Sequence, residues 1–249
     1  MTTNYSLIGT AFDYLLRFYL ERINKNSKTS KWVSYLSLDL IEDGRLKDNI
    51  SKLIKNAEKN YQKYLDDGML NDELLKSCIH LAQIDIIFRA GIVDENIGLC
   101  DSSNIQDLRN LYALLKKDDF KADVCILNPT FGEASLLVGG ADADIIINNS
   151  IIDIKTTKKI ELTKDYLNQI VGYYVLYRIG GINNEKNIKI DNVGIYFSRY
   201  GFLYKMPIKE VLNLGDIGSL IEWFKKRAKK EGYDYEKIIN NLSKKWNKK

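Results

Sequence analysis

The sequence predicts an α/β fold in which a helical N-terminal part precedes a mixed sheet flanked by helices, and a basic helical part follows the sheet. Apolar residues recur with helical period through residues 1–120. In residues 121–206 the pattern changes to short β-branched runs separated by turn residues. A helical pattern returns in residues 207–249, where lysines accumulate. We therefore expect a helical annex, a core and a basic helical extension with these bounds, packed as one compact unit.

Composition excludes several classes of protein. With 45% hydrophobic residues and two prolines in 249 residues, the chain is not of the disordered type. It has no apolar run near the roughly 20 residues that a membrane span needs, and its three scattered cysteines are typical of reduced thiols. We expect a cytoplasmic protein without a membrane partner. The net charge of +4 permits a nucleic-acid partner but does not require one.

Catalysis by an activated serine or cysteine is poorly supported. The chain has one histidine, no GxSxG turn and no cysteine beside a base, so nothing in it activates such a nucleophile. It also lacks a GxxxxGK[ST] loop and a strand-linked GxGxxG, which argues against a nucleotide-binding protein.

Four helices are predicted in the annex from helical periodicity, capping residues and glycine stops. They run from Ser6 to about Asn24, from about Asp43 to Asp66, from the cap Asn71 to near Arg89, and from Ser103 to Lys117 with Ser102 or Ser103 as cap. In the third helix, Asp85 and Arg89 are spaced for an ion pair at the helix end.

Strands and one helix are predicted in the core. Besides a central hairpin, the strand candidates are Asp123 to Leu127, Glu133 to Val138, Val193 to Arg199 and Phe202 to Met206. A helix begins near Thr163, and its Gly172 is expected to permit close contact with the sheet.

The central hairpin lies in the stretch 139–155, which reads GGADADIIINNSIIDIK. Two β-branched runs are separated by Asn148 and Asn149, residues that suit a tight turn. If these are the two turn residues, Ile147 faces Ser150 across the hairpin.

The same register brings Asp144 opposite Asp153. Because side chains alternate along a strand, Asp142 and Asp144 share one face, and Asp153 and Lys155 share that face too. Like charges directly opposed destabilise a strand pair, and crowded carboxylates raise one another's pKa.

A divalent cation relieves both penalties. Magnesium favours a site of one or two carboxylates completed by water and phosphate oxygens. A partly desolvated lysine such as Lys155 can hold or deprotonate a water molecule beside the metal. This set of groups suits phosphodiester hydrolysis.

The arrangement resembles the PD-(D/E)xK nuclease superfamily. Asp144, or alternatively Asp142, matches the first acid, and the run Asp153-Ile154-Lys155 matches the second acid and the lysine. Gln169-Ile-Val-Gly-Tyr173, on the predicted helix, resembles the QxxxY motif of the RecB-like branch, which includes CRISPR-associated exonucleases. The resemblance covers roughly residues 120 to 205. The proline that often precedes the first acid is absent.

This resemblance implies a restriction-endonuclease-like αβββαβ core and a metal-dependent deoxyribonuclease. The implied catalytic residues are Asp144, Asp153, Lys155, Gln169 and Tyr173. Mg²⁺ or Mn²⁺ would be held by Asp144 and Asp153 with the Ile154 carbonyl. Further candidate ligands are Glu133, in the preceding strand, and His80, the single histidine. Some RecB-like members hold an iron–sulfur cluster, but the cysteine spacing here predicts none.

Contacts to nucleic acid are expected from Tyr173, Arg199, Lys158 and Lys159. Resemblance to the RecB-like branch implies a DNA substrate, with single strands or ends favoured, and a role in repair or phage defence. A homo-oligomer or a protein partner would supply target choice. The alternative function is a catalytically silent, nucleic-acid-binding or assembly subunit with the nuclease fold. The basic C-terminal part also carries aromatic residues, among them Trp223 and Trp246, a combination that suits single strands.

Overall fold

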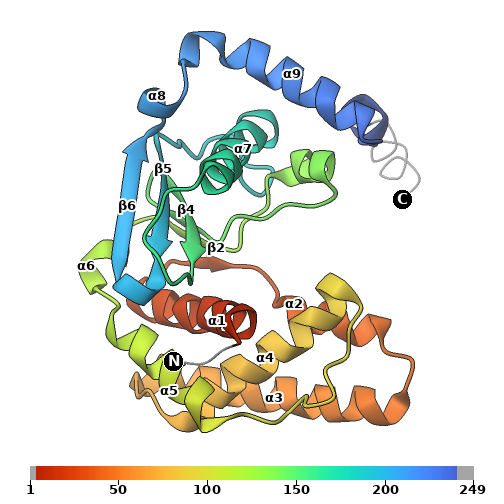
Figure 1. The fold of residues 1–249 in the computed structure, drawn as a ribbon, viewed down its shortest axis with the longest axis vertical. Helices are drawn as coiled ribbons and strands as arrows, with labels where there is room; N and C mark the ends of the chain where they lie inside the picture. Colours follow the sequence, from red (N-terminus) through yellow and green to blue (C-terminus); the bar gives the residue numbers. More distant parts are fainter. Residues whose placement is uncertain (1–3, 240–249) are drawn as a thin grey trace. The chain divides into compact units, whose positions relative to one another are not determined.

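The computed structural model describes residues 4–239, which adopt an α/β fold with a six-stranded mixed sheet and flanking helices (Figure 1). The strands are ordered β1-β2-β3-β4-β5-β6 in the sheet. They are β1 (Lys28–Thr29), β2 (Cys125–Leu127), β3 (Ile145–Ile147), β4 (Ser150–Lys155), β5 (Asn192–Phe197) and β6 (Phe202–Pro207). The α/β class is confirmed, while the nuclease core stays a prediction.

The helices of the described chain fall into two groups in sequence. Those before the central hairpin are α1 (Tyr5–Ile23), α2 (Val33–Ser37), α3 (Gly44–Asp67), α4 (Asp72–Ala90), α5 (Ser102–Ala113) and α6 (Lys117–Phe120). Those after it are α7 (Lys164–Gly180), α8 (Ile208–Val211) and α9 (Ile217–Lys230). Short 3-10 turns are η1 (Leu38–Leu40), η2 (Gly132–Val138), η3 (Ser198–Tyr200) and η4 (Leu214–Asp216).

Internal contacts divide the chain into two compact units. The first unit holds the residues up to Ala122 together with Ile154–Ile160 and Phe197–Phe202. The second unit holds Asp123–Asp153, Glu161–Tyr196 and the described residues from Leu203 on. Each unit is therefore assembled from segments that are distant in sequence.

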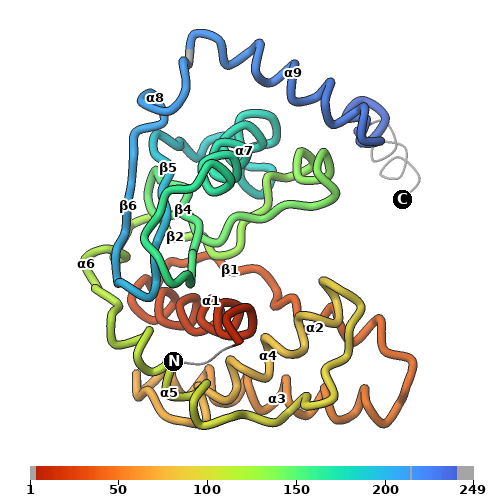
Figure 2. Tube along the Cα trace, in the orientation of Figure 1, coloured from red at the N-terminus to blue at the C-terminus, as the bar shows by residue number. Residues whose placement is uncertain are grey.

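The first unit is built on three long helices that contact one another, α1, α3 and α4 (Figure 2). Their bounds follow the predicted ones closely because the capping residues act as expected. The side chain of Asn71 accepts from the Leu74 N–H at 2.9 Å at the start of α4. Gly68 and Gly91 end α3 and α4 in the left-handed conformation. The first three predicted helices are confirmed.

The fourth predicted helix is shorter than expected. Its cap is Asp101 and it ends at Ala113, so Lys116 and Lys117 lie beyond it. A separate short helix, α6, begins at Lys117. The helix α2 was not predicted, because five residues are too few to show a helical period.

The central hairpin of the second unit has the predicted register. Ile147 pairs with Ser150 and Ile145 with Ile152 between the antiparallel strands β3 and β4. Asn148 adopts a positive φ of 52° in the turn. Its side-chain oxygen accepts from two backbone N–H groups that lead into β2. On its other side, β3 is also antiparallel to β2.

The strand predicted from Glu133 to Val138 is wrong: this segment forms the 3-10 turn η2. Ser135 holds the turn, since its hydroxyl accepts from the Phe131 N–H at 2.9 Å and donates to the Ala141 carbonyl at 2.7 Å. Local hydrogen bonds of this kind compete with strand pairing. Gly139, in the left-handed conformation, ends the turn.

Helix α7 begins after the cap Thr163, as predicted, and contacts η2. The close approach occurs at Gly180 and not at Gly172. A Cβ at Gly180 would meet the Phe131 carbonyl oxygen at 2.0 Å, whereas Gly172 has open space around it. The close contact with the sheet expected at Gly172 is therefore wrong, and the close approach at Gly180 is to Phe131 and Ala134, outside the sheet.

Between β6 and residue 239 the described chain is mainly helical, as predicted, and α9 contacts α7 and η2 within the second unit. Trp246 and the lysines at 244, 245, 248 and 249 lie outside the described residues. Within the described range, no helix combines the length and apolar character that crossing a membrane requires.

Candidate active site

The segment before β3 carries two of the predicted acidic residues along an extended backbone. Asp142 forms an isolated antiparallel bridge with Thr130, and the Asp144 carbonyl accepts from the Asn128 N–H at 2.9 Å. Between them, Ala143 is completely buried, whereas both aspartates are partly exposed. This alternation directs the two carboxylates to the side opposite Ala143.

Asp153 lies on β4, which neighbours β3 in the sheet. The hairpin register, continued one residue beyond β3, brings Asp144 level with Asp153. Asp153 is only 2% exposed. A carboxylate buried to this degree carries a large desolvation cost, which a cation or hydrogen-bond donors must offset.

The QxxxY pair is formed on α7. The Gln169 side-chain amide donates to the Tyr173 hydroxyl at 2.8 Å, as the four-residue spacing on one helix face allows. The Tyr173 ring packs against Phe131, with ring centroids 5.4 Å apart. Both contacts fix the position of the phenol.

Tyr173 connects the helix pair to the aspartates. Burial raises the pKa of its phenol well above the ordinary value of 10, and the negative charges of Asp144, Asp153 and Asp142 raise it further. The hydrogen bond from Gln169 acts in the opposite direction. The structure thus places the three carboxylates near one phenol, and the second unit contains all of these residues.

Lys155 is the last residue of β4 and lies two positions after Asp153. Strand alternation therefore gives both side chains the same face. The side chains of Ile154 and Lys155 are half-buried, and the Lys155 carbonyl accepts from the Ser198 hydroxyl at 3.4 Å.

Glu133 is placed differently from the prediction. It lies on η2 instead of a strand, and its charge raises the pKa of Tyr235 after the larger effect of burial. Its role as a metal ligand stays a prediction. Phe131, which sequence reasoning missed, is the aromatic partner of Tyr173. No periodic pattern marks it, because it stands in an irregular segment before η2.

The described residues contain no group of three or more His, Cys, Asp or Glu side chains arranged to hold a metal ion. The site nevertheless fits a cation that needs fewer protein ligands. Asp144 and Asp153 are level in the hairpin register and both act on Tyr173. Magnesium sites commonly use one or two carboxylates and take their remaining ligands from water and phosphate.

His80 lies on α4 in the first unit and is partly buried. Burial lowers the pKa of its imidazole, while a hydrogen bond with the Gly98 backbone acts in the opposite direction. Its proposed ligand role stays a prediction. The three cysteines form no disulfide, and the expected absence of an iron–sulfur cluster also stays a prediction.

The side chain of Arg199 is buried and does not lie at the surface. Its guanidinium bonds both oxygens of Asp107, at 2.9 and 3.1 Å, and the two side chains are 4% and 5% exposed. This buried, bidentate pair argues against the phosphate contact expected for Arg199. Lys158 and Lys159 are exposed, as a nucleic-acid contact requires, and the Lys158 ammonium lies 4.5 Å from the centre of the Tyr5 ring.

Comparison with known proteins gives no relative: no family model, no curated protein and no solved structure matches the chain.

Proposed function

We propose that this protein is a divalent-metal-dependent nuclease that hydrolyses phosphodiester bonds of DNA. The observation that supports it best is the hairpin register, which brings Asp144 level with the buried Asp153. These two acids and Asp142 also raise the pKa of Tyr173, whose phenol accepts a hydrogen bond from Gln169. An acid pair on a hairpin and a QxxxY pair on the next helix are separate features in the sequence. Their proximity in the fold is what the nuclease resemblance requires.

Asp144 and Asp153 would hold Mg²⁺ or Mn²⁺, with the Ile154 carbonyl as a further oxygen ligand. Asp142 is the alternative first acid. The metal, when bound, would stabilise the negative charge that develops on the phosphoryl oxygens. It would also offset the cost of burying Asp153, which is 2% exposed.

Tyr173 would contact the scissile phosphate as a neutral donor. Its raised pKa keeps the phenol protonated at neutral pH. Because Gln169 donates to the phenolic oxygen, the phenol's own hydrogen is directed elsewhere and suits a phosphate oxygen. Lys155 would orient the attacking water from the same strand face as Asp153.

The test is cleavage of end-labelled single- and double-stranded DNA, linear and circular, with Mg²⁺, Mn²⁺ or EDTA. We expect metal-dependent cleavage that falls at least about a hundredfold in Asp153→Asn and in Lys155→Ala, because each removes a group that acts at the reacting phosphate. Asp165→Asn is the matched control, because this exposed acid in the first turn of α7 is not among the proposed site residues.

The comparison of linear with circular DNA tests the expected preference for ends or single strands. A fully active Lys155→Ala variant would refute the assignment of the lysine. Binding of DNA without cleavage in any metal would favour the alternative, a catalytically silent subunit that acts with a protein partner or a second copy.

A further inference from the structure

We propose that one face of α9, made by Trp223, Lys226, Arg227 and Lys230, is a docking surface for single-stranded DNA. We call it the α9 basic face. The proposal rests on the proposed function, which it deepens by naming the form of the substrate.

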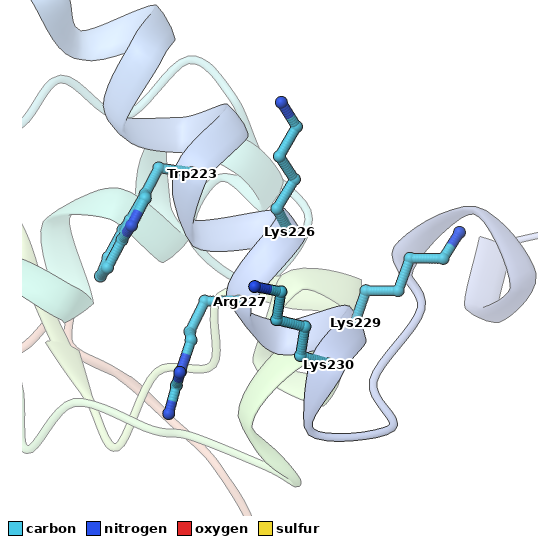
Figure 3. Close-up of a pocket in the computed structure, with 5 residues that line it drawn as sticks. All are labelled: Trp223, Lys226, Arg227, Lys229 and Lys230. Atoms are coloured by element: carbon cyan, nitrogen blue, oxygen red, sulfur yellow. The ribbon is translucent and has the colours of Figure 1, made fainter.

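The four residues stand at positions i, i+3, i+4 and i+7 of one helix, a spacing that places them on a single face. All four are exposed, Trp223 at 60%. Figure 3 shows Trp223 and Arg227 extending from the same side of α9. Together with Lys229, these residues line a surface pocket of about 560 Å³.

The opposite face of α9 packs against the second unit itself. Phe224 and Ala228 belong to an apolar stripe that is half-buried to buried, and the helix contacts η2 and α7. Phe224 and Ala228 also line a smaller pocket together with Leu137 of η2, and Trp223 and Arg227 stand at the edge of the same pocket. The apolar stripe of the helix is thus half-buried to buried against the protein's own chain.

The packing of this apolar face bears on which of the two usual partners of a basic helix, a membrane or a nucleic acid, α9 would bind. A helix that lies on a membrane inserts its apolar face into the lipid, whereas here that face packs against α7 and η2. On α9 itself, the large apolar side chain that remains exposed is that of Trp223, which stands among cations. Nucleic-acid bases stack on such a ring while their phosphates meet the cations, which favours a single strand, whose bases are accessible.

Some basic side chains of α9 are available to bind an anionic ligand. The helix carries five basic residues and one acid. Arg227 pairs with Glu231 at 3.0 Å and Lys229 with Asp234 at 2.7 Å, both at the exposed surface. Within the described part of the chain, neither Lys226 nor Lys230 forms an ion pair. Exposed pairs such as that of Arg227 are weak, so a phosphate can compete for its guanidinium.

The experiment measures binding of a fluorescently labelled oligothymidine of about 20 nucleotides, in EDTA and over a range of salt concentrations. We expect Trp223→Ala to weaken binding between about 5-fold and 150-fold, the range for loss of one stacked base. Trp223→Phe should retain most of the affinity, because it keeps an aromatic face. Thermal unfolding of each variant checks that the exposed substitutions leave the fold intact.

The cations are tested by the triple variant Lys226→Ala/Arg227→Ala/Lys230→Ala. Losing three phosphate contacts should reduce the slope of log affinity against log salt by about 2 for a single strand. The matched control removes three exposed lysines of α3, at positions 52, 55 and 59, and should leave the slope unchanged.

Several results would overturn the proposal: equal losses in the two triple variants, an unchanged affinity in Trp223→Ala, or binding to vesicles of anionic lipid without binding to the oligonucleotide. Because EDTA prevents metal-dependent cleavage, this measurement is independent of the proposed nuclease activity. Cleavage without the α9 effects would refute the docking surface alone. The α9 effects without cleavage would refute the nuclease alone.

Discussion

Asp85 shows how burial changes the behaviour of a single residue. Its carboxylate is 1% exposed and accepts a hydrogen bond from the Tyr14 hydroxyl at 2.7 Å. The ion pair predicted with Arg89 is present but long, at 3.9 Å, and Arg89 is half exposed. Burial dominates over these partners and raises the pKa of Asp85 from 3.8 to about 6.

This raised pKa gives stability a pH dependence of known sign. Above pH 4 the unfolded chain loses the Asp85 proton while the folded protein retains it. The contribution of Asp85 to the free energy of unfolding therefore falls as pH rises to about 6 and is then constant. The loss is on the order of 2 to 3 kcal/mol. Asp85→Asn keeps an acceptor for Tyr14 but has no proton to lose.

The measurement is urea unfolding of wild type and Asp85→Asn between pH 4 and pH 7. Other acids contribute to the pH dependence of both proteins, so the informative quantity is the difference between the two unfolding free energies. That difference should shift in favour of Asp85→Asn as pH rises to about 6. A difference that is the same at pH 4 and pH 7 would contradict the raised pKa of Asp85.

At the scale of elements, the hairpin was predictable because its determinants are local. Two β-branched runs with Asn148 and Asn149 between them fix both the turn and the register, and Asp144 and Asp153 follow from counting. The helix caps were predictable for the same reason. The proximity of Tyr173 to these acids also agrees with the motif order.

Elements that depend on particular tertiary contacts were not predictable. Residues 133–138 have the apolar content of a strand, but Ser135 turns the chain through bonds to Phe131 and Ala141. Arg199 was expected at the surface because nothing in the sequence indicates that Asp107, 92 residues away, meets it. Burial of a charge depends on a partner that periodicity cannot identify.

The turn of the hairpin provides a test at this scale. Asn148 supplies a positive φ of 52° and a side-chain oxygen that accepts from the N–H groups of Asp123 and Val124. Asn148→Gly keeps the backbone freedom but loses the acceptor, which should cost about 1 kcal/mol. Asn148→Ala loses both and should cost about 2 kcal/mol, because its Cβ disfavours the left-handed conformation.

Asn148→Asp is the matched control, since it keeps an acceptor and tolerates the left-handed region. Unfolding free energies from chemical denaturation should therefore fall in the order wild type, Gly variant, Ala variant, with the Asp variant near wild type. An Ala variant as stable as the Gly variant would show that the positive φ is not what the turn selects.

At the scale of the whole molecule, the first unit is assembled from separated segments. The segment Phe197–Phe202 belongs to it although the chain has by then passed through most of the second unit. Contacts within the unit hold this segment, among them that of Arg199 with Asp107 of α5 and that of the Ser198 hydroxyl with the Thr156 hydroxyl, at 2.9 Å. Gly201 packs closely on Leu114, where a Cβ would meet its carbonyl oxygen at 2.6 Å.

The buried Arg199–Asp107 pair should therefore show strong energetic coupling. Asp107→Ala leaves a buried guanidinium unpaired, which we expect to cost about 3 to 5 kcal/mol, and Arg199→Met leaves the carboxylate in the same state. The double variant buries no uncompensated charge and should be clearly more stable than the sum of the two single effects predicts.

Urea unfolding of wild type, the two single variants and the double variant gives the coupling free energy. Arg109→Met is the control, because the ion pair of Arg109 with Asp72 is exposed. If the two single effects simply add, the pair does not fasten residues 197–202 to α5, and the remaining contacts of Ser198 and Gly201 must hold the segment.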